Sequence, residues 1–253
     1  MSTATGESAT ELVPLAVTLD TEGGACVAGV TAQGRWLRPE PVNAAEVTGA
    51  DPVYTMHRPV RLDLGPATGG DARPEDRAVR GTPRRAGPLA GPDERAALLA
   101  AVADPDVATA FAYGRSAGLV AVRPLRYRRQ RSTGGRTFLR LEFTDRTGER
   151  FDWIVRDVRL LLNNDLRLPT NGDGDADGRD TGTLLAGPGA PELFAAVGLT
   201  HPNHRFPGRF RGCHPLVVGL HPADGSPITP VRPDGPPPYD TSLEGTAGAP
   251  GIA

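Results

Sequence analysis

The sequence predicts a mainly β protein with minor α-helix, built from small β-barrels. Six to nine short segments either alternate apolar and polar residues or run apolar between turn residues, as strands do. Few segments show helical features, and the strand–helix–strand units that would build a parallel sheet are absent. Small antiparallel barrels agree with this combination better than a doubly wound sheet does.

The most informative stretch is residues 26–39, CVAGVTAQGRWLRP, which predicts a β-hairpin with a Gln-Gly turn, ended by Pro39. Side chains alternate along a strand, so Trp36 and Arg38 are expected on one face and Leu37 on the other. The Trp36 and Arg38 pair allows two interpretations. It is a stacking and charge surface for a ligand, or it is a core tryptophan beside a solvated arginine.

The remaining elements follow in chain order. Further strands are expected at residues 12–19, 59–64, 119–127, 137–143, 149–155 and 212–220. Helices are expected at 92–103, from a cap at Asp104 to about Tyr113, at 158–163 after a cap at Asp157, and at 191–197. Segments 66–91 and 169–183 are rich in turn-forming residues, which indicates surface loops.

The composition limits the class of protein. A chain of 253 residues forms one large domain or two small ones. The net charge of −2 argues against a strongly basic nucleic-acid binder of the histone type. All 28 basic residues are arginines. A GC-rich genome explains this bias, and arginine also supplies planar donors for phosphate groups.

The location of the protein is predicted from its cysteines and its apolar segments. Cys26 and Cys213 lie far apart, which indicates free thiols in a reducing compartment. No stretch approaches the roughly 20 apolar residues of a membrane span. The first residues contain neither a basic nor an apolar signal region. We therefore expect a cytoplasmic bacterial protein with no membrane partner.

Several segments, in this order along residues 12–222, resemble the dual-OB-containing domain family of bacteria. The most specific of them matches the family pattern at Cys26, Gly29, Gly34, Trp36, Arg38 and Pro39. Shorter matches follow at Pro74, Glu75 and Asp76, and at Val155 and Asp157. The chain departs from the pattern at Arg77, where an aromatic residue is expected, and at His214-Pro215, where Tyr-Lys is usual.

This resemblance implies two small OB-like β-barrels in one chain. It suggests nucleic-acid binding but assigns no activity. The first barrel is expected over residues 12–118, with a helical insertion, and the second over residues 119–222. Residues 1–11 and the Pro- and Gly-rich tail at 223–253 are expected to be disordered.

Arginines are densest between residues 123 and 140, where seven occur within 18 residues. Beside an OB-type sheet, such a connector can attract phosphates, whereas the alternative is a solvated loop without a ligand. The nucleic-acid-binding residues that we expect are Arg35, Trp36, Arg38, Arg126, Tyr127, Arg128, Arg129 and Arg131.

Two groups of residues have metal-like spacing. The first contains His201, His204, Cys213, His214 and His221, but Cys213 and His214 are strand neighbours and are expected to point to opposite faces. The acidic run Asp173, Asp175 and Asp177 starts like a calcium loop, yet Leu184 stands where a bidentate glutamate is required. We therefore expect no metal and no cofactor.

Five carboxylates lie on or near the hairpin predicted at 137–155: Glu142, Asp145, Glu149, Asp152 and Asp157. Paired carboxylates can hold Mg²⁺ or act as acid and base, but no complete catalytic motif accompanies them. The expected function is non-catalytic binding of single-stranded DNA or RNA, alone or with a protein partner. The alternative is a small hydrolase or nuclease-like enzyme that uses these carboxylates or the histidine–cysteine group.

Overall fold

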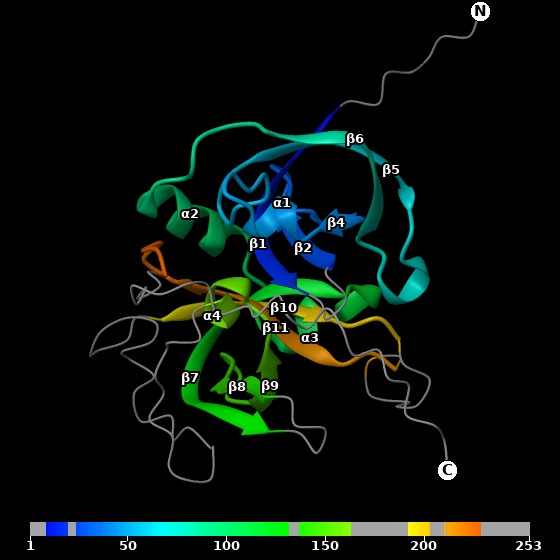
Figure 1. Ribbon diagram of the computed structural model, residues 1–253. Coiled ribbons are helices and arrows are strands. Elements are labelled where there is room, and N and C mark those ends of the chain that lie inside the picture. The colour runs from blue at the N-terminus through cyan, green and yellow to red at the C-terminus, as the bar shows by residue number, and fades with distance from the viewer. Residues whose placement is uncertain are drawn as a thin grey trace, which may run out of the picture.

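The structure, a computed structural model, describes residues 9–19, 24–131, 137–162, 192–202, 210 and 212–228. It is mainly β with minor α-helix, as the sequence predicts. The first sheet comes from the N-terminal part of the chain and the second from the C-terminal part, and they lie one above the other in Figure 1. Among the described residues, no helix is both long enough and apolar enough to cross a membrane.

The strands and helices have the following bounds. The first sheet contains β1 (Thr10–Leu19), β2 (Gly24–Val30), β3 (Trp36–Glu40), β4 (Val42–Asn43), β5 (Val60–Ala67) and β6 (Asp76–Arg85). The second contains β7 (Ala117–Arg131), β8 (Thr137–Thr144), β9 (Arg150–Val155), β10 (Leu193–Leu199) and β11 (Pro215–Pro222). The helices are α1 (Ala45–Thr48), α2 (Pro92–Val102), α3 (Val107–Ala110) and α4 (Val158–Leu162), with 3₁₀ turns η1 (Gly70–Ala72) and η2 (Ala112–Gly114).

The two sheets share one topology. The second is a closed barrel with the strand order β10-β11-β9-β8-β7, in which β7 pairs with β10. The first has the order β1-β5-β6-β3-β2-β4, and a β1–β2 pairing connects five of these strands into a ring. In both rings, the first three strands pair in turn, and the fourth strand of the ring (β5 or β10) returns to lie beside the first (β1 or β7). This is a Greek-key path. In both, the third and fifth strands pair in parallel, β3 with β6 and β9 with β11.

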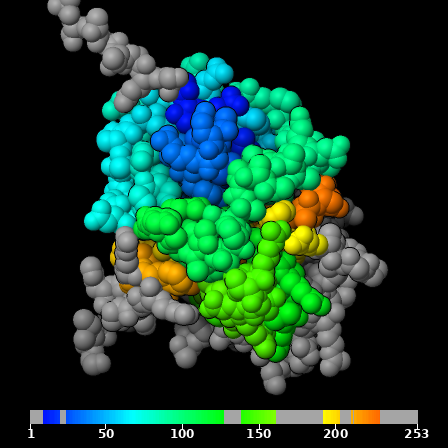
Figure 2. Space-filling model, turned by 180° about the vertical axis from the view of Figure 1, so that it is seen from behind, coloured from blue at the N-terminus to red at the C-terminus, as the bar shows by residue number. Residues whose placement is uncertain are grey.

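Buried apolar side chains form three clusters. One fills the barrel around Leu141 and Phe143, and one fills the first ring around Val27 and Leu37. The third joins outward-facing residues of both rings with Leu99 of α2. Figure 2 shows the first ring, in blue and cyan, in contact with the green and yellow barrel along this seam. Apolar burial therefore stabilises the seam as well as each ring.

The two hairpins expected from the sequence are confirmed. β2 pairs with β3, with Val30 opposite Trp36, and β8 pairs with β9, with Leu141 opposite Trp153. Helix α2 also lies where it is predicted, with its first-turn proline and two acidic residues. These segments carry their signals locally, in the alternation of side chains and in the residues at a helix start.

The helix predicted at 191–197 is wrong, because Leu193–Leu199 forms strand β10. All seven residues of β10 are buried. Leu193 and Ala195 pack inside the barrel, whereas Phe194 and Ala196 pack in the seam. An apolar run that is buried on both faces has no polar alternation to separate it from a helix.

The loop predicted at 66–91 contains strand β6, which pairs antiparallel with β5 and parallel with β3. Most side chains of β6 are exposed or half-buried. Its sequence therefore lacks the alternation that reveals a strand, and backbone pairing holds it in place.

The ends of several elements also differ from the prediction. Strand β3 continues through Pro39 to Glu40. The cap of α3 is Asp106 rather than Asp104, because the Asp106 carboxylate accepts the Thr109 amide at 2.7 Å. Strand β1 begins at Thr10, and Ile228 packs in the barrel cluster, so ordered structure extends beyond residues 12–222 at both ends.

We predict that Gly29→Ala lowers the free energy of unfolding by about 1–3 kcal/mol, the usual cost of overpacking. A Cβ atom at Gly29 would lie 2.3 Å from the carbonyl oxygen of Val13 on β1. Denaturant unfolding measures the effect. The control is Gly87→Ala, whose Cβ would meet only Pro59, at 3.6 Å, and which should be neutral or slightly stabilising. Equal stability of the two variants would contradict the close β1–β2 approach.

Candidate functional site

A cavity of about 920 Å³ lies between the outer face of the first ring and the barrel. Ligand pockets typically have volumes of roughly 300–1,000 Å³. The polar lining of this cavity includes Cys26, Arg38, Glu40, Arg73, Arg156 and His201. Its apolar lining includes Leu19, Phe138, Ile154, Leu199, Leu216 and Val218. An apolar hollow with a few convergent polar groups is the usual form of a binding site.

Two arginines share one buried carboxylate at this cavity. Asp76 is fully buried, and its two oxygens lie 2.5 Å from Nη1 of Arg38 and 3.0 Å from Nε of Arg73. Arg73 also contacts Glu40, with its Nη2 3.2 Å from Oε1. Both arginines are almost completely buried, so these ion pairs hold their side chains in fixed positions.

A second buried carboxylate connects the first ring to the start of the barrel. Glu75 accepts two hydrogen bonds from Ser116, one from its amide at 2.9 Å and one from its hydroxyl at 2.5 Å. Arg38 in turn donates to the Ser116 hydroxyl at 3.2 Å and to the Ser116 carbonyl at 3.3 Å. Ser116 immediately precedes β7, so this network fixes the barrel against the cavity wall.

Cys26 and His201 lie at the same wall and both contact Arg73. Arg73 donates to the Cys26 sulfur at 4.0 Å and contacts Nε2 of His201. Burial raises the pKa of the Cys26 thiol, although Arg38 and Arg73 oppose this shift. Burial and the adjacent Arg73 lower the pKa of His201. Since a guanidinium can only donate, Nε2 of His201 acts as the acceptor.

The described lining of the cavity is more cationic than anionic. It includes three arginines, Arg38, Arg73 and Arg156, against the one carboxylate of Glu40. Arg156 follows β9 and donates to the carbonyl of Leu19. Guanidinium groups bind phosphates and carboxylates by paired hydrogen bonds, so this wall can receive an anionic group.

The structure does not place Trp36 and Arg38 on an exposed surface. Trp36 is 6% exposed and packs in the seam, as its core interpretation predicts. Arg38 is 3% exposed and paired with Asp76, so it is not solvated either. Of the three residues expected on this hairpin, only Arg35 is exposed. Arg38 contributes to the cavity wall instead.

The second group of expected nucleic-acid-binding residues lies on β7. Arg126 is half-buried there. The side chains of Tyr127, Arg128, Arg129 and Arg131 lie outside the described residues, although their backbones pair with β8. Nucleic-acid binding by these residues stays a prediction.

The structure separates the histidine–cysteine group. His201 lines the cavity, Cys213 is buried, His214 is exposed and His221 is buried elsewhere. His204 and the calcium-like run at 173–178 lie outside the described residues. Within the described ranges, no three His, Cys, Asp or Glu side chains are placed to hold a metal ion.

His221 forms a buried pair with His57. Nε2 of His221 lies 2.8 Å from the carbonyl oxygen of Leu15, and Nδ1 of His221 lies 3.0 Å from Nε2 of His57. Burial lowers the pKa of His57 to about 2 and that of His221 to about 3. Both rings are therefore neutral at physiological pH.

Four of the five hairpin carboxylates have structural contacts. Glu142 pairs with Arg150, and Asp152 pairs with Arg140. Asp145 accepts the amides of Val107 and Thr147. Asp157 caps α4 by accepting the Arg159 amide at 3.0 Å, and it also accepts the Leu220 amide. The fifth, Glu149, is exposed at the hairpin turn. A catalytic role for these carboxylates stays an untested alternative.

The cavity wall and the buried network behind it contain residues that sequence analysis did not select. Glu40, Arg73, Glu75, Asp76 and Ser116 were not among the predicted site residues. Glu75 and Asp76 do belong to a segment that carries the family resemblance, and this was the available signal. Arg73 lies in the same segment, next to Pro74, whereas Ser116 stands alone in the sequence, and only the fold brings both residues to Arg38. The chain matches no protein-family profile, no curated protein and no solved structure.

Asp76→Asn should lower the free energy of unfolding by about 3–5 kcal/mol, because Arg38 and Arg73 would lose the buried charge that they share. Denaturant unfolding at neutral pH measures this change. The matched control is Asp51→Asn. Asp51 is 82% exposed and forms an ion pair with Arg85. That change should cost no more than about 1 kcal/mol. Similar losses in both variants would refute the central role of Asp76.

The buried histidine pair predicts a loss of stability in acid. An unfolded chain protonates His57 and His221 near pH 6.5, whereas the native pKa values are about 2 and about 3. Between pH 6.5 and 3, the unfolded state therefore binds more protons, and stability falls as the pH falls. Each histidine contributes up to about 1.4 kcal/mol per pH unit.

Unfolding curves across this pH range test the prediction. In His221→Gln, the amide can still donate to Leu15 and accept from His57, and the pH slope should decrease by one histidine's share. An unchanged slope in His221→Gln would show that the pair does not titrate as described.

Proposed function

We propose that this protein binds single-stranded nucleic acid without catalysis, and that the cavity receives one nucleotide unit. The observation that carries the proposal is a convergence of residues. Cys26 from β2, Arg38 and Glu40 from β3, and Arg73 from the β5–β6 connection line the same cavity.

The topology supports an OB-type assignment for both halves. Each is a five-strand ring with a Greek-key path, which is the architecture of OB folds. OB folds bind oligonucleotides on the face of their second and third strands and in the connections between strands 1 and 2 and strands 4 and 5. In the first ring, β2 and β3 are the second and third strands, and Arg73 lies in the connection between the fourth and fifth. The cavity therefore lies where an OB fold would bind its ligand.

The chemistry of the lining agrees with a nucleotide. Arg156 and the paired arginines offer hydrogen-bond donors to a phosphate. Ile154, Leu216 and Val218 of the barrel offer an apolar wall for a base. Because the barrel and the wall formed by the first ring face each other across the cavity, the space suits one nucleotide unit better than a continuous strand. The structural contacts of four hairpin carboxylates favour binding over the hydrolase alternative.

Arg156→Gln should weaken the binding of short single-stranded DNA or RNA for all sequences alike. It should also reduce the slope of log affinity against log salt by about 0.7, the value for one lost phosphate contact on a single strand. Fluorescence anisotropy at several salt concentrations measures both. The control is Arg150→Gln on β9, where the arginine is 67% exposed and paired with Glu142, and where both quantities should change less.

A mononucleotide should compete with the oligonucleotide, because it fills the same cavity. The proposal fails if the wild-type protein binds neither DNA nor RNA at low salt, or if the two arginine variants behave alike while both fold normally.

A further inference from the structure

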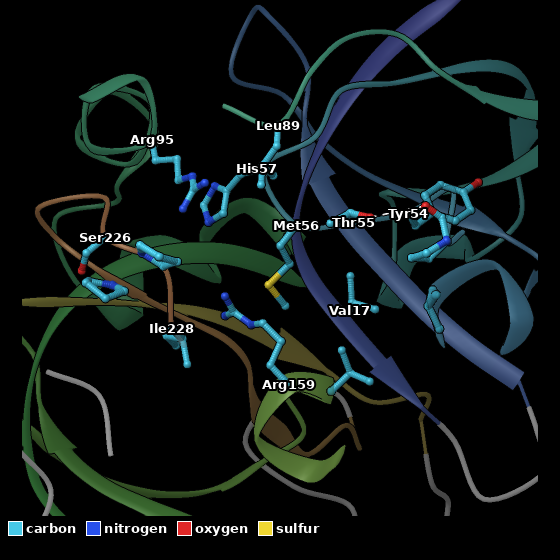
Figure 3. A pocket seen from close by; sticks show the side chains of 15 residues that line it. Val17, Tyr54, Thr55, Met56, His57, Leu89, Arg95, Arg159, Ser226 and Ile228 are labelled. Atoms are coloured by element: carbon cyan, nitrogen blue, oxygen red, sulfur yellow. Dashed lines mark hydrogen bonds between the residues drawn. The ribbon is translucent and has the colours of Figure 1, made fainter. Parts of the chain in front are cut away.

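A second pocket, of about 210 Å³, lies apart from the Cys26 wall and shares none of its polar residues. The chain around residues 52–57, helices α2 and α4, and the segment after β11 form it (Figure 3). Apolar residues dominate its lining, among them Val17, Met56, Val158 and Ile228. Its charged and ring-nitrogen groups are Arg95, Arg159 and His57.

Arg95 is a buried cation whose charge no carboxylate of the described residues balances. The residue is only 8% exposed. Its Nε donates to the carbonyl of Ala90 at 2.8 Å, and its Nη1 donates to the carbonyl of Gly225 at 3.4 Å. No ion pair to a carboxylate forms at Arg95 within the described part of the chain. Burial of a charge is costly unless an opposite charge accompanies it, so this pocket favours an anion.

His57 supplies an acceptor that has no partner. A carbonyl oxygen only accepts, so Nε2 of His221 carries a proton and donates to Leu15. Nδ1 of His221 then accepts from Nε2 of His57. In the neutral His57 ring, Nδ1 therefore holds a lone pair. That atom is buried and has no hydrogen-bond partner among the described residues. His57 itself is only 6% exposed and lines the pocket.

A single ligand that satisfies both Arg95 and His57 must therefore carry two different polar groups. Figure 3 shows the Arg95 side chain extending from α2 toward the His57 ring. The guanidinium needs an anionic acceptor, and the imidazole lone pair needs a donor close to it. A water molecule could bond to both groups, but it would not supply the negative charge.

We propose that this pocket binds a small aliphatic α-hydroxy acid. Its carboxylate pairs with Arg95, its hydroxyl donates to Nδ1 of His57, and its hydrocarbon chain packs against Met56, Val158 and Ile228. The volume agrees, since an apolar cavity of about 150 Å³ holds a benzene-sized molecule. An α-amino acid is disfavoured, because the lining that the structure describes contains no carboxylate for its ammonium group and Arg159 lies nearby.

Isothermal titration calorimetry with four probes of one carbon skeleton tests the ligand class. The probes are 2-hydroxy-4-methylpentanoate, 4-methylpentanoate without the hydroxyl, 4-methylpentane-1,2-diol without the carboxylate, and leucine. The hydroxy acid should bind at least about tenfold more tightly than each of the others. A tenfold loss corresponds to one missing hydrogen bond, either to Arg95 or to His57. Binding should also move the ¹⁵N resonance of Nδ1 in His57. Equal binding of leucine, or no binding of the hydroxy acid at millimolar concentration, would overturn the proposal.

Arg95→Met separates a ligand-binding role from a structural one. This variant removes an unbalanced buried charge and keeps an apolar side chain of similar length. It should bind the hydroxy acid at least about tenfold more weakly, while its melting temperature without ligand stays equal to or above that of wild type. Arg150→Met, which changes an exposed arginine paired with Glu142 on the β8–β9 hairpin, should leave binding unchanged. A lower melting temperature in Arg95→Met with unaltered affinity would mean that Arg95 is structural, and the proposal would be wrong.

Discussion

The carboxylate of Asp76 determines how the first ring closes and where its cavity wall forms. Arg38 on β3 and Asp76 at the start of β6 are register partners in the parallel pair that completes the ring. The ion pair between their side chains therefore coincides with the backbone pairing that brings the third and fifth strands together. Arg73 approaches the same carboxylate from the connection that leads into β6. A fully buried carboxylate without these partners would strongly oppose folding. The contact that allows the ring to close thus also fixes two arginines at the cavity.

The cavity depends on both rings, because the barrel covers the outer face of the first ring here. Side chains of β3 show how this is achieved. Leu37 packs inside the first ring, Trp36 packs in the seam, and Arg38 reaches the cavity. The seam cluster and the contact of Glu75 with Ser116 hold the barrel in place. A ligand between the rings would therefore meet a polar wall from one half and a largely apolar wall from the other.

The mainly β architecture could be predicted from the sequence where a strand has one buried and one exposed face. This is why the hairpins at 26–39 and 137–155 were found. Strand β6 was missed because its side chains are largely exposed, and β10 because both of its faces are buried. For the site, the two-residue period correctly places Trp36 and Arg38 on one face. It does not reveal that a second ring covers this face. The meeting of Arg73 and Ser116 with Arg38 depends on strand register and on packing between the rings, which no local pattern encodes.

The two pockets use arginine in physically different ways. In the large cavity, Arg38 and Arg73 already have buried carboxylate partners, so a phosphate would gain only their remaining donors and would meet the opposing charge of Glu40. Arg156, which the structure bonds to a backbone carbonyl, has more attraction left for an anion there. In the small pocket, Arg95 has carbonyl partners but no carboxylate partner among the residues that the structure describes, and the adjacent lone pair of His57 has no hydrogen-bond partner there. The free protein thus bears an electrostatic cost at Arg95 that a bound anion would relieve. A bound anion would therefore gain more electrostatic stabilisation per arginine in the smaller pocket than in the large cavity.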